Sequence, residues 1–149
     1  MSETIDNPSN TEVETSPTVT KLAGESMSQR LEPLELWRRV HLAIVKSEAP
    51  DLTIRQYALL LAIYMNDPPH TVRGLAEQLG ISKPAVVRAI DTLSRLGYVK
   101  RKVDTEDRRS VLIQRTVPGS VFLSEFADLM QRVNWDYAAE RGDPFDPNG

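Results

Sequence analysis

The sequence predicts a mainly α-helical chain with one small β-hairpin, arranged as a winged helix-turn-helix with flanking N- and C-terminal helices. Three observations predict this fold. Residues 70–97 have the pattern of two short amphipathic helices joined by a glycine turn. Residues 98–115 have the pattern of two strands around a charged tip. Apolar residues also recur at helical spacing on both sides of this stretch.

Composition excludes several classes of protein. The chain has 149 residues, no cysteine and two histidines, so no disulfide scaffold or thiolate metal site can form. We therefore expect no metal and no cofactor. No apolar run is long enough to cross a bilayer, and the N-terminus lacks a signal-peptide pattern. We expect a cytoplasmic protein with no membrane partner.

The first predicted helix runs from Pro33 to about Ser47. It carries an apolar stripe that is typical of either a core or a subunit contact, formed by Leu34, Trp37, His41, Ile44 and Val45. The second helix follows Thr53, with Gln56 three residues later in a capping-box pattern. It is apolar almost all round, which predicts burial on several sides. Residues 66–69 then break it, and His70 is expected in a loop.

The predicted helix-turn-helix begins at Thr71, which can cap its first helix. Gly80 ends that helix, because glycine adopts a positive φ at little cost. Ser82 can cap the second helix, and Pro84 lies in its first turn, where a missing amide hydrogen costs little. Val86 and Ile90 are expected to face inward. This pattern alone also fits an ordinary helical hairpin.

The second helix of a helix-turn-helix enters the major groove of DNA and presents its N-terminal residues to base edges. Here these residues are Ser82, Lys83, Ala85, Val87 and Arg88. Arg88 is the best candidate for reading a guanine, because a guanidinium can donate two hydrogen bonds to that base. The alternative is a solvated surface arginine. The net charge of the chain is −3, but positive residues are concentrated between residues 82 and 109.

Residues 98–103 and 110–115 are predicted strands, with Val99, Val111 and Ile113 on the inner face. The tip between them, Asp104–Arg109, is fully polar, so we expect it to project from the core. An arginine at such a tip can enter the minor groove, and Asp107 can orient it by a charge-assisted pair. Taken alone, the segment also fits an ordinary polar hairpin turn.

A last predicted helix covers residues 120–141. Its apolar stripe is either core or a dimer face, and the matching stripe of the first helix favours a dimer face. The stripe comprises Phe122, Phe126, Leu129, Met130, Val133 and Tyr137.

Residues 1–28 are expected to be a disordered acidic tail. This tail is either an arm that competes with DNA or, as we favour, a solubilising segment. Residues 29–141 form the predicted domain, with 70–117 as its DNA-binding core and wing, and 142–149 form a flexible tail.

The chain resembles the MarR family of winged-helix transcription regulators over roughly residues 34–130. The resemblance is carried by Leu52–Gln56, Leu75–Ala76, Leu93–Gly97, the tip Asp104–Arg109, and Thr116 with Gly119. It implies that Arg109 lies in the minor groove, held by Asp107, while Ser82, Lys83, Val87 and Arg88 meet the major groove. The chain departs from the family at Val87, where a threonine is common, and at Arg115, where an apolar residue is usual. It also has one predicted C-terminal helix in place of a long pair.

These observations predict a sequence-specific regulator that binds double-stranded DNA as a homodimer. Phosphate contacts are expected from Thr71, Arg73, Lys100, Arg101, Lys102 and Arg108. The resemblance also implies a small-molecule effector, for which Trp37, His41, Tyr57 and Tyr64 are candidates, although the same residues suit a core. The alternative function is a protein–protein interaction module. No nucleophile with a base is evident in the sequence, so we do not expect an enzyme.

Overall fold

The computed structural model describes residues 27–142. These residues form five helices, labelled α2 to α6, and three strands. The bounds are α2 Met27–Lys46, α3 Ile54–Met65, β1 His70–Thr71, α4 Val72–Leu79, α5 Lys83–Arg95, β2 Val99–Val103, β3 Val111–Arg115 and α6 Val117–Arg141.

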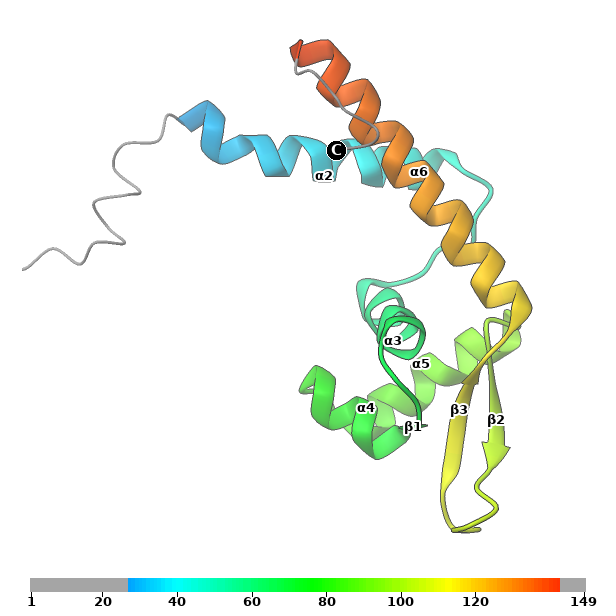
Figure 1. Ribbon diagram of the computed structural model, residues 1–149. Coiled ribbons are helices and arrows are strands. Elements are labelled where there is room, and N and C mark those ends of the chain that lie inside the picture. The colour runs from blue at the N-terminus through cyan, green and yellow to red at the C-terminus, as the bar shows by residue number, and fades with distance from the viewer. Residues whose placement is uncertain (1–26, 143–149) are drawn as a thin grey trace, which may run out of the picture.

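 Figure 1 shows α3, α4, α5 and the strands gathered in one lobe, while α2 crosses α6 at the opposite end of the molecule. The predicted tails lie outside the described residues except at their inner ends, where Met27 and Ser28 are helical and Gly142 is the C-cap of α6. Within residues 27–142, no helix is both long and apolar enough to cross a membrane.

The lobe is held together by side chains that its helices and strands bury against one another. The most deeply buried are Leu59, Leu60, Ile63, Leu75, Val86, Ile90, Leu93, Val99 and Ile113. The burial of α3 and the inward orientation of Val86 and Ile90 are as predicted. Removing this apolar surface from water stabilises the lobe in proportion to the area buried, and it fixes α5 against α3 and α4.

The predicted start of α3 and both predicted ends of α4 are confirmed. Thr53 and Gln56 form the capping box of α3. The Thr71 hydroxyl accepts from the amide of Gly74 at 3.0 Å, which caps α4. Gly80 ends that helix with a φ of 63°, in the left-handed region that favours glycine. Each of these helix ends is formed by residues that lie within one helical turn of each other in the sequence. A local sequence pattern can therefore predict them.

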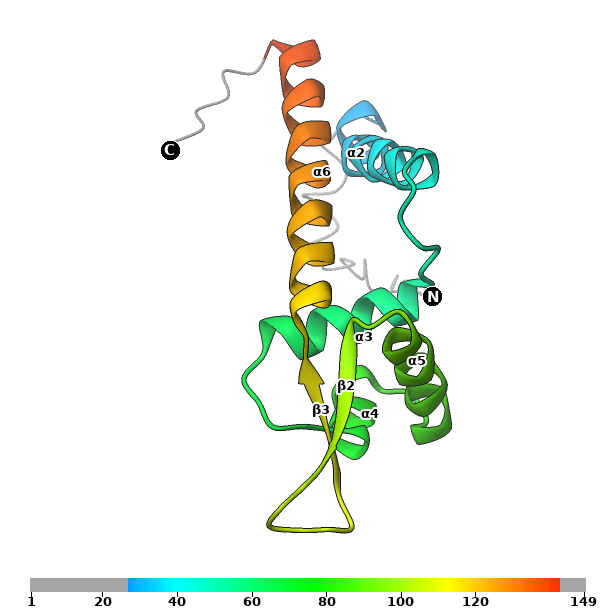
Figure 2. The same cartoon turned by 90° about the vertical axis from the view of Figure 1, so that its right-hand side faces the viewer.

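The sheet has the order β1–β3–β2, with both pairings antiparallel. His70 is buried in β1 and lies opposite Ile113, so its expected place in a loop is wrong. A strand of two residues has no periodicity that a sequence can display. Val99 and Ile113 are buried as predicted, but Val111 is exposed, because the wing extends beyond the core at its tip end. Figure 2 shows this narrow projection.

Two helices begin earlier than predicted. Helix α2 starts at Met27 and continues through Pro33, where the sequence predicts its start. Helix α6 starts at Val117 after the Thr116 cap, with Pro118 in its first turn, rather than at residue 120. The buried side of α2 is centred on Val40, whereas Leu34 and Trp37 of the predicted stripe are 59% and 53% exposed. That stripe therefore does not form a core within one chain.

A cluster of polar contacts, the Tyr64 junction (Tyr64, Tyr98, Arg115, Thr116 and Gly119), joins α6 to the lobe. The Tyr64 hydroxyl donates to the carbonyl of Tyr98 at 2.7 Å and accepts from the amide of Thr116 at 2.8 Å. The Arg115 guanidinium donates to the carbonyls of Ile63 and Asn66, at 2.8 and 2.6 Å, and so satisfies the C-terminal end of α3. Arg115, a departure from the family pattern, therefore has a structural role.

Gly119 lies at the closest approach in this junction. A Cβ atom there would overlap the Tyr64 hydroxyl and the Tyr98 carbonyl oxygen. The position is buried in the first turns of α6, so neither neighbour can withdraw without breaking a hydrogen bond. Glycine is required here by lack of space and not by backbone conformation.

We predict that Gly119→Ala lowers the free energy of unfolding by about 3 kcal/mol, because the added methyl group must displace Tyr64 or the Tyr98 backbone. Urea denaturation followed by circular dichroism measures the change. The control is Gly74→Ala in α4, whose Cβ would meet only the Thr71 hydroxyl, at 3.2 Å. It should change stability by no more than about 1 kcal/mol. Equal effects of the two substitutions would contradict the argument from space.

Ion pairs connect α2 with α6 at the end of the molecule remote from the wing. Glu35 pairs with Arg38 and Arg39 at 2.7 and 2.8 Å, and Arg39 also reaches Glu140 of α6 at 2.6 Å. Arg141 of α6 pairs with a glutamate of α2, Glu32. Hydrogen bonds from Arg38 and then Arg39 lower the pKa of Glu35 from 4.5 to about 2. The charged form of Glu35 is therefore favoured by the folded arrangement.

This shift predicts a pH dependence. A carboxylate whose pKa is lower in the folded state stabilises that state above its ordinary pKa of 4.5, and the contribution is lost as pH falls toward about 2. We expect Glu35→Gln to lower the melting temperature at pH 7 and to have a progressively smaller effect between pH 4.5 and 2. Melting curves across this range, with Glu106→Gln at the wing as the control, measure the effect. A difference that is constant over this range would contradict the prediction.

Candidate nucleic-acid interface

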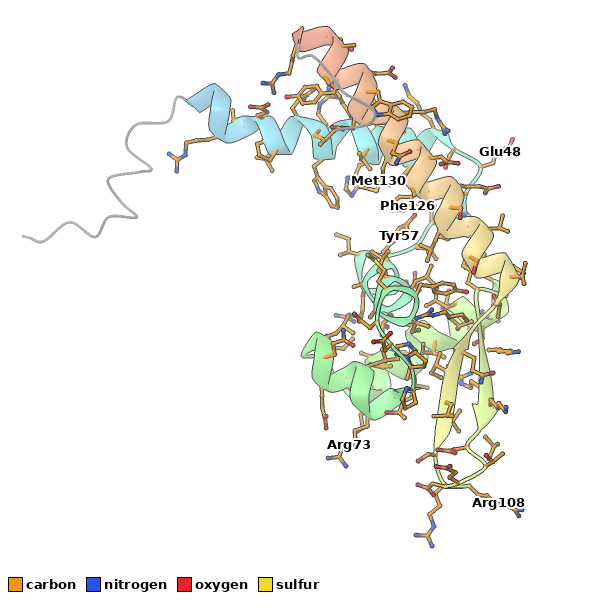
Figure 3. All side chains as sticks on the ribbon, in the orientation of Figure 1. Glu48, Tyr57, Arg73, Arg108, Phe126 and Met130 are labelled. Carbon is orange, nitrogen blue, oxygen red and sulfur yellow. The ribbon has the colours of Figure 1, made fainter. Side chains whose placement is uncertain are left out.

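One side of the molecule presents α4, the start of α5 and the wing together. Figure 3 shows Arg73 on α4 and Arg108 at the wing tip projecting on the side away from α2 and α6. The wing and α5 are connected by an ion pair of 2.5 Å between Arg101 of β2 and Asp91 of α5. Both side chains of this ion pair are exposed to solvent.

The exposed residues of α5 define its outer face. Lys83 and Arg88 are exposed, and Val87 is 39% exposed between them. Ala85, which was expected to face DNA, is only 7% exposed and packs inward beside Val86, so that expectation is wrong. Its small side chain lies on the side of α5 that contacts the core. The exposed Ser82 caps α5, its hydroxyl accepting from the amide of Ala85 at 3.4 Å.

The positive side chains on this face differ in whether they are already paired. Arg73 pairs with Glu77 of its own helix at 2.9 Å, and Arg101 pairs with Asp91. In the part of the chain that the structure describes, no ion pair is made by Lys83, Arg88, Lys100, Lys102, Arg108 or Arg109. All six are exposed. They can approach an anionic partner without first breaking an internal ion pair.

The wing tip is folded by two carboxylates that accept hydrogen bonds from the backbone. Asp104 accepts from the amide of Glu106 at 2.9 Å. Asp107 accepts from the amide of Arg109 at 3.1 Å and from the hydroxyl of Ser110 at 2.9 Å. Asp107 thus holds the backbone at Arg109, whereas the sequence suggested a pair with its guanidinium. The side chains of Arg108 and Arg109 extend from a turn whose shape is set by these bonds.

The four residues suggested for an effector site are not brought together. Trp37 and His41 lie on α2 with their ring centroids 4.1 Å apart, and His41 Nδ1 is 2.8 Å from the carbonyl oxygen of Trp37. Tyr64 belongs to the Tyr64 junction. Tyr57 alone lines the large cavity described next. The shared aromatic character of these residues says nothing about which of them face each other.

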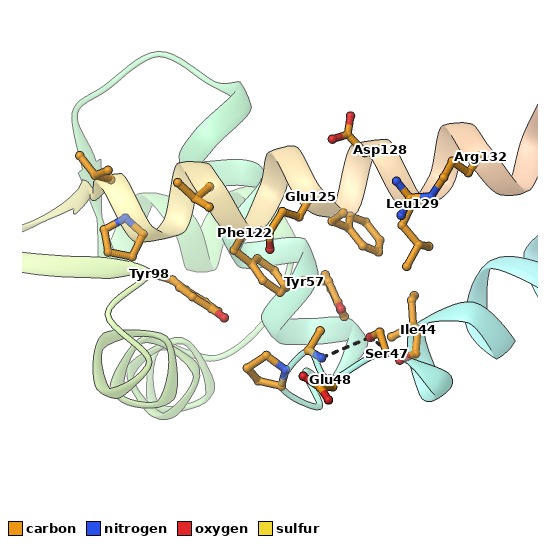
Figure 4. A pocket seen from close by; sticks show the side chains of 16 residues that line it. Ile44, Ser47, Glu48, Tyr57, Tyr98, Phe122, Glu125, Asp128, Leu129 and Arg132 are labelled. Carbon is orange, nitrogen blue, oxygen red and sulfur yellow. Dashed lines mark hydrogen bonds between the residues drawn. The ribbon is translucent and has the colours of Figure 1, made fainter.

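A cavity of about 740 Å³ separates the lobe from α6 and the end of α2. Figure 4 shows Tyr57 and Tyr98 on the lobe side and Phe122, Glu125 and Leu129 on the α6 side. Sequence reasoning placed Phe122 in an apolar stripe but assigned no role to Tyr98 or Glu125. Nothing in the local pattern of those two residues indicates a cavity, because its walls come from segments far apart in the chain.

Comparison with known proteins agrees with this geometry. Residues 51–110 match the model of the MarR family. The S. aureus MepR–DNA complex is similar in structure, with a TM-score of 0.61 and 20% identity over 78% of this chain and 93% of that one. The repressor CouR, solved bound to a 23-mer DNA duplex, gives 0.58 and 24% identity over 83% of both chains.

The transcriptional regulator Tm0710 from Thermotoga maritima has a TM-score of 0.62 and 18% identity, covering 84% of this chain and 81% of its own. The matched residues 51–110 contain α3, the helix-turn-helix and most of the wing, which are the elements that build the positive face. Over residues 51–110 the chain is therefore similar to the MarR family, and its fold is that of the solved structures above.

Proposed function

We propose that the chain is a sequence-specific regulator that binds double-stranded DNA with α5 in the major groove and the wing in the minor groove. The observation that carries the proposal is the gathering of exposed, unpaired cations on α5 and the wing. Arg88 projects from α5, where a guanidinium can read a guanine by two hydrogen bonds. The DNA complexes of MepR and CouR support this arrangement by their similar folds.

Arg109 is proposed to enter the minor groove. A narrow minor groove has an enhanced negative potential that attracts arginine. Asp107 supports this role because it holds the backbone amide of Arg109 and so orients the residue without occupying its guanidinium. Arg108, also exposed, is proposed to contact a phosphate on the flank of the groove.

The remaining proposed contacts are to the DNA backbone. Phosphates attract positive side chains regardless of sequence, and such contacts supply much of the affinity. We propose Lys100 and Lys102 as direct phosphate contacts, while Lys83 is proposed to meet the major groove with Ser82, Val87 and Arg88. Arg73 and Arg101 must share their charge with Glu77 and Asp91, so we propose smaller contributions from them. Thr71 is proposed to act through the start of α4, which its hydroxyl caps.

We propose that the active form is a homodimer. Apolar side chains of α2 and α6 are exposed in the single chain: Leu31, Leu34, Trp37, Leu42, Val45, Val121, Met130 and Trp135. Large apolar side chains exposed on two helices that pack against each other are typical of a protein interface. A two-fold pair of helix-turn-helix units binds two half-sites about one turn of DNA apart.

We also propose that a small-molecule effector binds the cavity beside Tyr57. The alternative function, a protein-interaction module, predicts that this apolar surface is used without DNA.

We predict that Arg88→Ala and Arg109→Ala each weaken binding to a selected DNA duplex by about 1 to 3 kcal/mol and relax base preference at one position. Lys102→Ala should weaken all sequences alike and reduce the slope of log affinity against log salt by about one. The duplex is obtained by selection from a random pool with the full chain, and affinities are measured by fluorescence anisotropy.

The matched control is Lys46→Ala, which removes the same charge from the exposed end of α2 away from the wing. It should leave affinity unchanged. Failure of the selection to enrich any sequence, or equal binding by all the variants, would rule out sequence-specific recognition and favour the protein-interaction module.

For the dimer, we predict that Trp37→Glu shifts the full chain from twice its 16.7 kDa mass to the monomer in analytical ultracentrifugation, because a charge would be buried in the apolar contact. Val103→Glu places the same charge at another exposed apolar position, on the wing, and should leave the dimer intact. A monomeric wild-type chain at micromolar concentration would contradict the proposed homodimer.

A further inference from the structure

The cavity between the lobe and α6 has aromatic walls. Tyr98 stacks on Phe122 with ring centroids 4.5 Å apart, and Tyr57 lies 5.1 Å from Phe126 and 6.2 Å from Phe122. Tyr57, Tyr98, Phe122 and Phe126 all line the cavity. At about 740 Å³ it has the size of a site for a small organic molecule. Its walls suit a ligand with a large apolar body.

More negative than positive side chains line the cavity. Glu48, Glu125 and Asp128 line it, against one positive residue, Arg132. Figure 4 shows Glu125 directed from α6 toward the aromatic side chains, Glu48 on the opposite wall, and Asp128 pointing away on the outer side of α6. None of the four makes an ion pair within residues 27–142. Two unpaired carboxylates therefore remain beside an apolar space.

One further observation indicates a negative potential at the cavity wall. Burial, and then the charge of Glu125, raise the pKa of the Tyr98 phenol, so that carboxylate acts on the cavity wall. Aromatic faces attract cations through their quadrupoles, and this attraction adds to that of the carboxylates.

We propose that this cavity binds an organic cation, a positively charged centre carried on an aromatic or aliphatic body, with Glu125 and Glu48 as its counter-charges. The inference rests on the proposed function for the presence of an effector in this cavity, and it names the chemical class of that effector. An organic anion of the same shape would bring a like charge toward both carboxylates. A neutral molecule would leave them without a counter-ion.

The test compares two probes of nearly equal shape and opposite charge, tetraphenylphosphonium and tetraphenylborate, by isothermal titration calorimetry with the full chain and without DNA. We expect the cation to bind at least about tenfold more tightly than the anion. Glu125→Gln should weaken cation binding about five- to tenfold, and Glu48→Gln should weaken it in the same direction, because each removes a nearby opposite charge while keeping the side-chain shape.

Two variants serve as controls on the same wall. Asp128→Asn removes an equal charge that points away from the cavity and should change cation affinity less than twofold. Arg132→Gln removes the like charge at the far end and should strengthen binding. Circular dichroism is used to check that each of these variants is folded.

The inference is overturned if the borate binds as tightly as the phosphonium, if neither binds, or if Glu125→Gln and Asp128→Asn have equal effects. DNA binding is measured separately by anisotropy with no probe present. A chain that binds DNA but shows no preference for the cation disproves the ligand class alone. A chain that binds the cation but no DNA disproves the proposed regulatory function alone.

Discussion

The Tyr64 hydroxyl is the contact on which the arrangement of the molecule depends. It joins α3 to the backbone of Tyr98 before the wing and to the backbone of Thr116 before α6. Gly119 allows the first turns of α6 to come this close, and Arg115 attaches the end of β3 to the end of α3. The direction of α6 depends on this junction together with the packing of Phe122 on Tyr98 and Tyr57.

The same attachment separates two kinds of surface. On the wing side, cations on α5, β2 and the tip are exposed, and the aspartates of the tip are occupied by backbone amides. On the other side, α2 and α6 are connected by ion pairs yet expose large apolar side chains. A formal net charge of −3 for the chain conceals this division, because the distribution of charge governs attraction to a polyanion.

The cavity lies between the lobe that carries the positive face and the helix α6, and residues of both line it. Tyr57 and Tyr98 belong to the lobe that carries the positive face, while Phe122 and Glu125 belong to α6. A molecule bound there would contact both sides of the Tyr64 junction. Its binding energy would then depend on the angle between α6 and the lobe, which is the condition for a ligand to shift a conformational equilibrium.

The sequence by itself determined the caps of α3, α4 and α5, the turn at Gly80, the charged wing tip and the inward position of Val86 and Ile90 on α5. Each of these depends on contacts within a few residues or on a regular periodicity, and both are visible in a linear sequence. Only the tertiary structure decided the roles of Tyr64, Arg115 and Glu125, the two-residue strand β1 and the outward side of α2. Arg115 and the carbonyl it caps are 52 residues apart, and the cavity walls come from α2, α3 and α6. Such contacts arise from packing between distant segments, which no local pattern records.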